Sequence, residues 1–265
     1  MGKAGTLLRI IKKLIREPKS IARIFDDSEI WTRKGYEKGL PTVDILDLLP
    51  NRTLTVHPYS FLYGTSLPID MALLRALASR FDECKYIEIG TWRGESAVNV
   101  ADFTSECYTV DLSADEMKRR GFSREYIEAT AFFSNGDPRI THIRQDSRTL
   151  DPLVIGKFDL IFIDGDHSYK GIKADTQLAF QLLKDSSSII VWHDYGTGPE
   201  RVCWKTLAAI LDGSPPSSHK KIYHVSNTMC AAYLPYSYPT SYPPFPQIPN
   251  KKFRIAIDVS KIEED

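Results

Sequence analysis

The sequence lacks an excess of charge of either sign, because its 34 lysines and arginines balance its 34 aspartates and glutamates. A dedicated nucleic-acid-binding protein carries a basic excess, so the balance argues against nucleic acid as a partner. The chain also lacks an apolar run long enough to span a bilayer. Its 265 residues are 42% hydrophobic, which is typical of one large globular domain with appendages.

Cysteine is scarce, and the four cysteines form no C-x-x-C pair. Their scatter, at Cys84, Cys107, Cys203 and Cys230, excludes a disulfide framework and a cysteine-rich zinc site. We therefore expect buried thiols in a reducing compartment and predict a cytoplasmic protein.

The N-terminal segment is a basic amphipathic arm. Charges interleave with its apolar residues, which makes a secretory signal unfavourable. Such an arm either meets an anionic membrane surface or a partner, or packs on its own domain or a second subunit. We assign residues 1–59 to this arm and a linker. The apolar positions at helical spacing are Leu7, Leu8, Ile11, Leu14 and Ile15.

A strand, a glycine turn and a helix follow one another at residues 86–100. Residues 86–89 have the β-branched and aromatic composition of a strand. Gly90 and Gly94 allow a tight turn, and a ligand placed there meets free N–H groups of the following helix. Asp111 ends the next expected strand, about 20 residues beyond Gly90, where an acidic side chain binds ribose hydroxyls in nucleotide folds.

The glycine spacing discriminates between nucleotides. A dinucleotide turn requires G-x-G-x-x-G, but only Gly90 and Gly94 are glycine here, and Glu88 would repel a pyrophosphate. Residues 88–94, Glu-Ile-Gly-Thr-Trp-Arg-Gly, resemble motif I of the class I S-adenosylmethionine-dependent methyltransferases. The resemblance implies S-adenosylmethionine as cofactor. The residues that the resemblance implies for contact with the cofactor in this part of the chain are Glu88, Gly90, Thr91, Gly94, Ser96 and Asp111.

Polar clusters also follow the later strands. Strand-like residues 140–144, 158–163 and 188–192 end in polar side chains, and the carboxyl ends of strands are where open α/β sheets bind ligands. The resemblance implies that Asp146 and Ser147 meet the adenine ring.

The expected fold is α/β, a Rossmann-like, doubly wound, mostly parallel seven-stranded sheet between helical layers. Residues 221–225 and 229–234 read as an antiparallel C-terminal hairpin. We assign residues 60–235 to the cofactor-binding domain and 236–265 to a proline-rich tail. Residues 253–259 of the tail read as a last strand, which could add to a partner.

Residues 157–195 are similar to bacterial sugar and small-molecule O-methyltransferases, with the layout of the magnesium-using catechol and caffeoyl-CoA type. The similarity implies that Asp164 and Asp194 hold Mg²⁺ or another divalent cation, and that Asp164 also meets the cofactor. Tyr195 stands where that type has asparagine. His167 stands where its lysine base would be, and the ordinary pKa of histidine suits a base. His193 is the second candidate for this role.

We therefore expect methyl transfer to a hydroxyl of a small molecule or sugar, assisted by histidine and aspartate. Two alternatives stay open: an NAD(P)-dependent or other nucleotide-binding Rossmann enzyme, and a non-catalytic module that only binds the cofactor. The sequence contains no readable motif for the acceptor.

Overall fold

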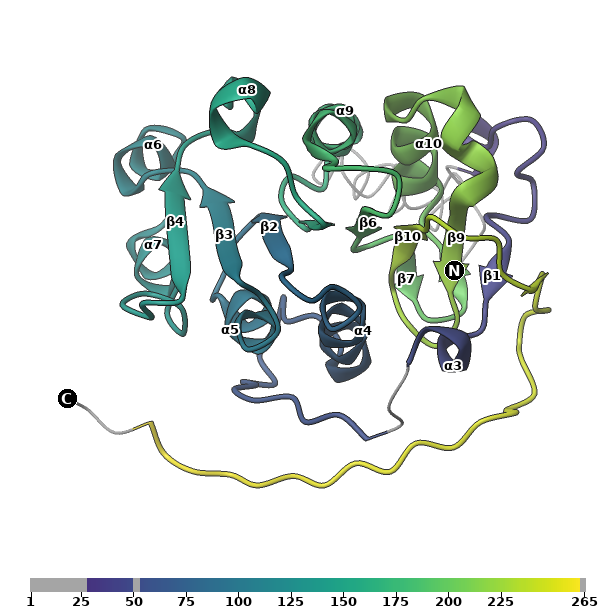
Figure 1. The fold of residues 1–265 in the computed structure, drawn as a ribbon, viewed down its shortest axis with the longest axis horizontal. Helices are drawn as coiled ribbons and strands as arrows, with labels where there is room; N and C mark the ends of the chain where they lie inside the picture. Colours follow the sequence, from purple (N-terminus) through teal and green to yellow (C-terminus); the bar gives the residue numbers. More distant parts are fainter. Residues whose placement is uncertain (1–27, 50–52, 263–265) are drawn as a thin grey trace, which may run out of the picture.

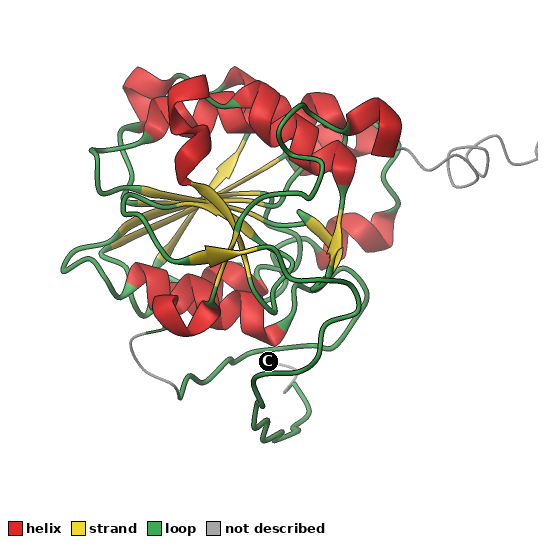
Figure 2. Ribbon diagram, turned by 90° about the vertical axis from the view of Figure 1, so that its right-hand side faces the viewer, coloured by secondary structure: helices red, strands yellow, loops and turns green. Residues whose placement is uncertain are grey.

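The computed structural model describes residues 28–49 and 53–262, so the predicted amphipathic helix at residues 7–15 lies outside them. A sheet runs through the centre with helices on both faces (Figures 1 and 2). In order across the sheet, the strands are β11 (Thr240–Ser241), β1 (Thr42–Val43), β9 (Ile222–Val225), β10 (Ala231–Tyr233), β6 (Ile189–Trp192), β5 (Leu160–Ile163), β2 (Lys85–Ile89), β3 (Glu106–Asp111) and β4 (Ile140–Arg144).

Strands β4, β3, β2, β5 and β6 are parallel to one another, and β10 is antiparallel to both β6 and β9. Every residue of β5 and β6 is buried, as their continuous apolar sequences require when helices cover both faces of a parallel sheet. The predicted Rossmann-like sheet with an antiparallel C-terminal hairpin is therefore confirmed.

Two helical layers cover the sheet. Helices α3, α4 and α5 pack on one face through residues such as Leu74 and Val100, and α9 and α10 pack on the other through Leu182 and Leu207 (Figure 1). The helices are α2 (Ser28–Trp31), α3 (Ile45–Leu48), α4 (Pro68–Ala78), α5 (Glu95–Ala101), α6 (Ala114–Arg119), α7 (Arg124–Ala129), α8 (Pro152–Ile155), α9 (Tyr169–Leu182) and α10 (Trp204–Gly213), with 3₁₀ turns η2 (Ser147–Thr149) and η3 (Pro216–Lys221).

All seven predicted strands are present, but the sheet of the described residues has nine, because two short strands that were not predicted join it. The first extra strand, β1, comes from the segment predicted to be linker, where it pairs with β9 and β11. The second, β11, comes from the tail. Each has two residues, too few to show the alternation that identifies a strand. Residues 253–259 form no strand, and their large apolar side chains are exposed.

The tail after β11 runs back across the domain (Figure 1). Two contacts hold it there. Lys251 Nζ lies 2.8 Å from a carboxylate oxygen of Asp44, next to α3. The backbone N–H of Gln247 donates to Glu200 at 2.8 Å, just before the short strand β8 (Arg201–Val202), which pairs with β7 (Gly196–Gly198). Within the described ranges, no helix combines the length and the apolar character that crossing a bilayer demands.

Candidate active site

The predicted site residues gather at one edge of the sheet. Strands β2, β3, β5 and β6 are parallel, so the residues that follow their carboxyl ends meet there. Gly90, Thr91, Gly94 and Ser96 line a hollow together with Asp164. The glycine turn and the end of β5 thus lie together at this edge of the sheet.

Both glycines of the turn are required by close contacts. Gly90 has a φ of 102°, and a Cβ there would collide with the backbone of Asp164 and Gly165. Gly94 has a φ of 80° at the start of α5, and a Cβ there would collide with Ser134. Only glycine adopts these conformations without cost, so the two residues let the turn lie against β5 on one side and Ser134 on the other.

Glu88 lies beneath the turn and faces the interior. Its carboxylate accepts hydrogen bonds from the Tyr86 hydroxyl at 2.8 Å and the Thr109 hydroxyl at 3.1 Å, and the residue is fully buried. Burial raises the pKa of Glu88 to about 8. In this conformation Glu88 supports the turn from below, and a direct contact with the cofactor stays a prediction.

Asp111 lies beside the turn, and its contact with a ribose stays a prediction. Its carboxylate accepts from the N–H of Thr91 at 3.3 Å and from the N–H of Leu112 at 2.7 Å. Burial raises the pKa of Asp111. The carboxylate is therefore positioned by backbone donors at the edge of the turn.

The predicted adenine contacts are engaged with other protein groups. Asp146 accepts from the guanidinium groups of Arg148 at 2.6 Å and Arg120 at 2.8 Å, and these partners hold its pKa well below the usual range. The hydroxyl of Ser147 donates to Asp175 at 2.6 Å. An adenine ring would have to share Asp146 with two arginines, so the adenine role stays a prediction.

The centre of the site is a cluster of carboxylates and imidazoles. His193 Nδ1 lies 3.2 Å from Asp164 Oδ1 and 3.1 Å from Asp194 Oδ1. His167 Nδ1 lies 2.7 Å from Asp194 Oδ2, and its side chain is 63% exposed. The structure thus brings together all four residues predicted to carry the chemistry.

The two histidines differ in environment. His193 is buried and, although burial lowers its pKa, the facing carboxylates of Asp164, Asp194 and Asp70 raise it well above the ordinary value. The hydrogen bond to Asp194 raises the pKa of His167. His193 is thus a buried cation between carboxylates. His167 is exposed to solvent, and its Nδ1 is the ring nitrogen that contacts Asp194.

Asp70 belongs to this cluster and was not predicted. It lies in the first turn of α4, is fully buried, and its Oδ2 lies 3.2 Å from His193 Nε2. It also accepts from the N–H of Met229 at 3.1 Å. In the sequence, Asp70 looks like an ordinary acidic residue at a helix N-terminus, so only the fold reveals its partner.

Asp166 and Tyr195 lie next to the cluster in the sequence but make other contacts. Asp166 accepts from the backbone N–H and the hydroxyl of Ser168, at the start of α9, and thus supports the helix entry. Tyr195 is buried away from the cluster, and its hydroxyl accepts from the N–H of Leu40 at 2.9 Å. Tyr195 therefore does not replace the missing asparagine.

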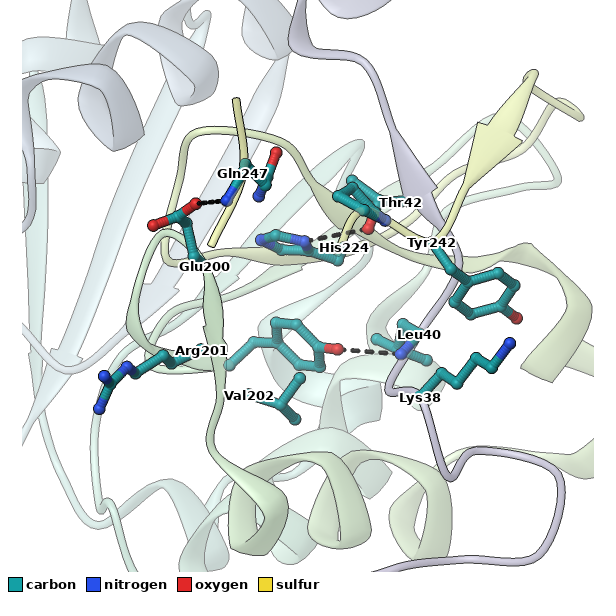
Figure 3. Close-up of a pocket in the computed structure, with 11 residues that line it drawn as sticks. Lys38, Leu40, Thr42, Glu200, Arg201, Val202, His224, Tyr242 and Gln247 are labelled. Carbon is teal, nitrogen blue, oxygen red and sulfur yellow. Dashed lines mark hydrogen bonds between the residues drawn. The ribbon is translucent and has the colours of Figure 1, made fainter. Parts of the chain in front are cut away.

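A second hollow lies beside β9 and the tail (Figure 3). His224 and Thr42 form one side, with the Thr42 hydroxyl 3.2 Å from His224 Nδ1. Lys38 and Tyr242 form another, and the contact between Gln247 and Glu200 closes the end. Burial lowers the pKa of His224 to about 4, so its imidazole is neutral there.

Residues 87–195, from β2 to the end of the His193–Asp194 cluster, match a family model described as "Methyltransferase domain". The match covers less than half of the chain, and this stretch is similar to methyltransferase domains.

Two curated proteins show similarity in sequence. The uncharacterized protein y4gI of Sinorhizobium fredii is 28% identical over 156 residues, which span 54% of this chain but 16% of y4gI. The uncharacterized protein R132 of Acanthamoeba polyphaga mimivirus is 26% identical over 149 residues, which span 52% of this chain and 66% of R132. The chain thus spans less than two thirds of either relative's length.

Solved structures are also similar to part of this chain. The SAH-bound methyltransferase PaMTH1 of Podospora anserina is 19% identical, with 64% of this chain and 79% of that chain covered and a TM-score of 0.45. The O-methyltransferase from Bacillus cereus in complex with SAH is 16% identical, with 65% and 84% covered and a TM-score of 0.45. Likenesses at this level say nothing about the acceptor of this chain.

Proposed function

We propose that this chain transfers a methyl group from S-adenosylmethionine to a hydroxyl oxygen of a small molecule or sugar. The observation that carries the proposal is the position of the His167–Asp194 pair, at the same sheet edge as the glycine turn. The turn offers backbone N–H groups and the start of α5 to the amino-acid end of the cofactor. Asp164, which lines the same hollow, links this end to the histidines.

His167 is the proposed base. Its Nδ1 faces Asp194, so the neutral ring carries its proton on Nδ1 and leaves Nε2 free to accept one. In the reaction, the acceptor oxygen attacks the methyl carbon, the bond between carbon and sulfur breaks, and His167 takes the hydroxyl proton. Asp194 stabilises the imidazolium that results, as the carboxylate does in other histidine–aspartate pairs.

His193 is not the base in this proposal. Its two ring nitrogens face Asp70 on one side and Asp164 and Asp194 on the other, so neither is free for a substrate. We assign it a positioning role, in which one buried cation holds the carboxylates of α4, β5 and β6 in a fixed arrangement.

A divalent cation is compatible with the same residues. Asp164, His167 and Asp194 each offer one ligand atom, and these atoms lie within 4.8 Å of one another. Carboxylate and imidazole donors both suit divalent ions. An ion held there would lower the pKa of the acceptor hydroxyl, and His167 would then be a ligand and not the base.

The test is a titration with S-adenosylhomocysteine, followed by a screen of acceptors with labelled S-adenosylmethionine. We expect the cofactor product to bind and label to appear on a hydroxyl compound. Binding of NAD without binding of S-adenosylhomocysteine would instead support a dinucleotide enzyme. Cofactor binding with no labelled product across phenols, catechols and sugars would support a non-catalytic module.

A further inference from the structure

The loop at residues 57–66 forms a wall of the hollow beside the glycine turn. Gly64, Thr65 and Ser66 line that hollow together with Asp164. The hydroxyl of Ser66 donates to Asp164 Oδ2 at 3.4 Å. The loop therefore contacts the acidic cluster and shares a hollow with the turn.

Buried side chains of α5 hold this loop in place. Glu95 is 4% exposed, and its carboxylate accepts from the N–H of Ser60 at 2.5 Å and from the hydroxyl of Thr65 at 3.0 Å. Asn99 is fully buried and accepts from the N–H of His57 at 2.8 Å. Charge-assisted and buried hydrogen bonds are the strong ones, so α5 fixes both ends of the loop.

Three consecutive large apolar side chains project from the fixed loop. Phe61, Leu62 and Tyr63 are 62%, 56% and 97% exposed. The backbone below them is closed by a hydrogen bond from the Thr65 N–H to the Leu62 carbonyl at 3.2 Å, and the Arg93 guanidinium donates to the Tyr63 carbonyl at 2.9 Å.

The backbone of the loop is strained at the start of this run of exposed side chains. Phe61 has a φ of 56°, which is a strained conformation for a bulky residue. Strained residues persist only where the surroundings impose them, and they cluster at ligand-binding sites. A run of exposed apolar residues is also unfavourable in water unless a ligand covers it. Rigidity, strain and exposure thus coincide at the rim of the site.

We propose that Phe61, Leu62 and Tyr63 form the recognition surface for an apolar portion of the methyl acceptor. This inference rests on the proposed function and adds the acceptor class: a hydroxyl compound with an aliphatic or aromatic body attached. The continuity of the loop with the hollow favours an acceptor. Gly64 to Ser66 line the same hollow as Asp164, residues 61–63 directly precede them, and the Tyr63 carbonyl accepts from Arg93, which also lines the hollow. A membrane surface and a second copy of the chain are the rival occupants.

The experiment compares methyl β-glucoside with octyl β-glucoside as probes, below the micelle-forming concentration and with saturating S-adenosylhomocysteine. Each buried methylene strengthens binding about fourfold, since its burial contributes about 0.8 kcal/mol. We expect octyl glucoside to bind at least about tenfold more tightly than methyl glucoside to the full chain. The triple variant Phe61→Ser, Leu62→Ser, Tyr63→Ser should lose this preference.

Two further variants keep the test decisive. Tyr63→Ser alone removes the most exposed ring and leaves the backbone contacts of the loop in place, so it should reduce the preference without unfolding. The matched control is Ile255→Ser with Ile257→Ser, which removes two exposed apolar side chains from the tail and should change nothing.

Four outcomes overturn the inference. Two concern the probes: the unaltered chain binds both equally, or the preference for octyl glucoside survives the triple variant. The other two support the rival occupants: the triple variant loses binding to phosphatidylcholine vesicles, or it converts a dimer to a monomer. Affinity for S-adenosylhomocysteine separates the two proposals. If the unaltered chain does not bind it, the proposed function fails; if it does and the probes are not discriminated, only this inference fails.

Discussion

His193 Nε2 lies 3.2 Å from Oδ2 of Asp70, a fully buried carboxylate supplied by α4 and not by the strand ends. This contact joins the helix that precedes β2 to the end of β6, about 120 residues later in the chain. It means that the arrangement of the acidic cluster depends on how α4 packs. A substitution at Asp70 should therefore affect stability and the site together.

Asp70→Asn should destabilise the protein by about 3 kcal/mol, because removing one partner leaves the buried His193 charge less compensated. Urea unfolding at pH 7 measures this. The control is Asp47→Asn, an exposed acidic residue in α3, which should stay within about 0.5 kcal/mol of the unaltered chain. A loss below about 1 kcal/mol for Asp70→Asn would mean that the contact contributes little.

His167→Ala should lower kcat by about 10²- to 10⁴-fold, the usual contribution of a general base. Affinity for S-adenosylhomocysteine should stay unchanged, because His167 is 63% exposed and bonds only to Asp194 among the contacts described. Single-turnover kinetics and calorimetry give the two values. His219→Gln, at the distant turn η3, serves as control. Retention of full turnover by His167→Ala would disprove the assignment of the base.

Chelation of divalent ions should leave turnover largely intact, because the His167–Asp194 pair can remove the hydroxyl proton without an ion. The measurement is turnover before and after exhaustive dialysis against a chelator, followed by addition of Mg²⁺ or Mn²⁺. A loss of turnover that an added ion restores would instead make Asp164, His167 and Asp194 a ligand set.

Glu88→Gln should change how stability depends on pH. The folded protein holds the Glu88 proton up to a pKa of about 8, against an ordinary value of 4.5, so it binds more protons than the unfolded chain between these values. Stability therefore falls as pH rises from about 4.5 to about 8. Denaturation midpoints across this range should fall less steeply for Glu88→Gln, whereas the exposed Glu83→Gln should follow the unaltered chain. Parallel curves for Glu88→Gln and the unaltered chain would contradict this account.

Trp92→Phe should weaken binding of S-adenosylhomocysteine severalfold, while leaving stability the same or slightly higher. The indole N–H of Trp92 is buried without a hydrogen-bond partner and lies beside Gly64, in the wall of the hollow. A ligand atom can accept this bond, and an unpaired buried donor costs free energy in its absence. Unchanged affinity would show that the N–H does not meet the cofactor.

Much of the architecture could be predicted because buried parallel strands have a strong sequence signature. Residues 160–163 and 189–192 are continuous apolar runs followed by polar residues, and parallel pairing then brings Asp164 and His193 together. The glycine turn could also be predicted, because the close contacts with Asp164 and Ser134 require glycine at positions 90 and 94, and glycines directly after a strand are visible in the sequence.

The rest depended on contacts that local pattern does not encode. Strand β1 has two residues and exists only because β9 and β11 flank it. Asp70 joins the site only through its contact with His193, which follows β6. Glu95, which the sequence shows as an ordinary helix-start residue, proved to be the main anchor of the loop at residues 57–66. Each of these roles arises from long-range packing, which a single sequence does not display.

The position of β1 bears on the order in which the chain folds during synthesis. Thr42 and Val43 are made early, yet their pairing partners in β9 and β11 leave the ribosome some 180 to 200 residues later. Strands β2 to β6 can associate before then, since all of them precede β9 in the chain. The outer border of the sheet, together with the hollow between Thr42 and His224, is thus the last part of the domain to be completed.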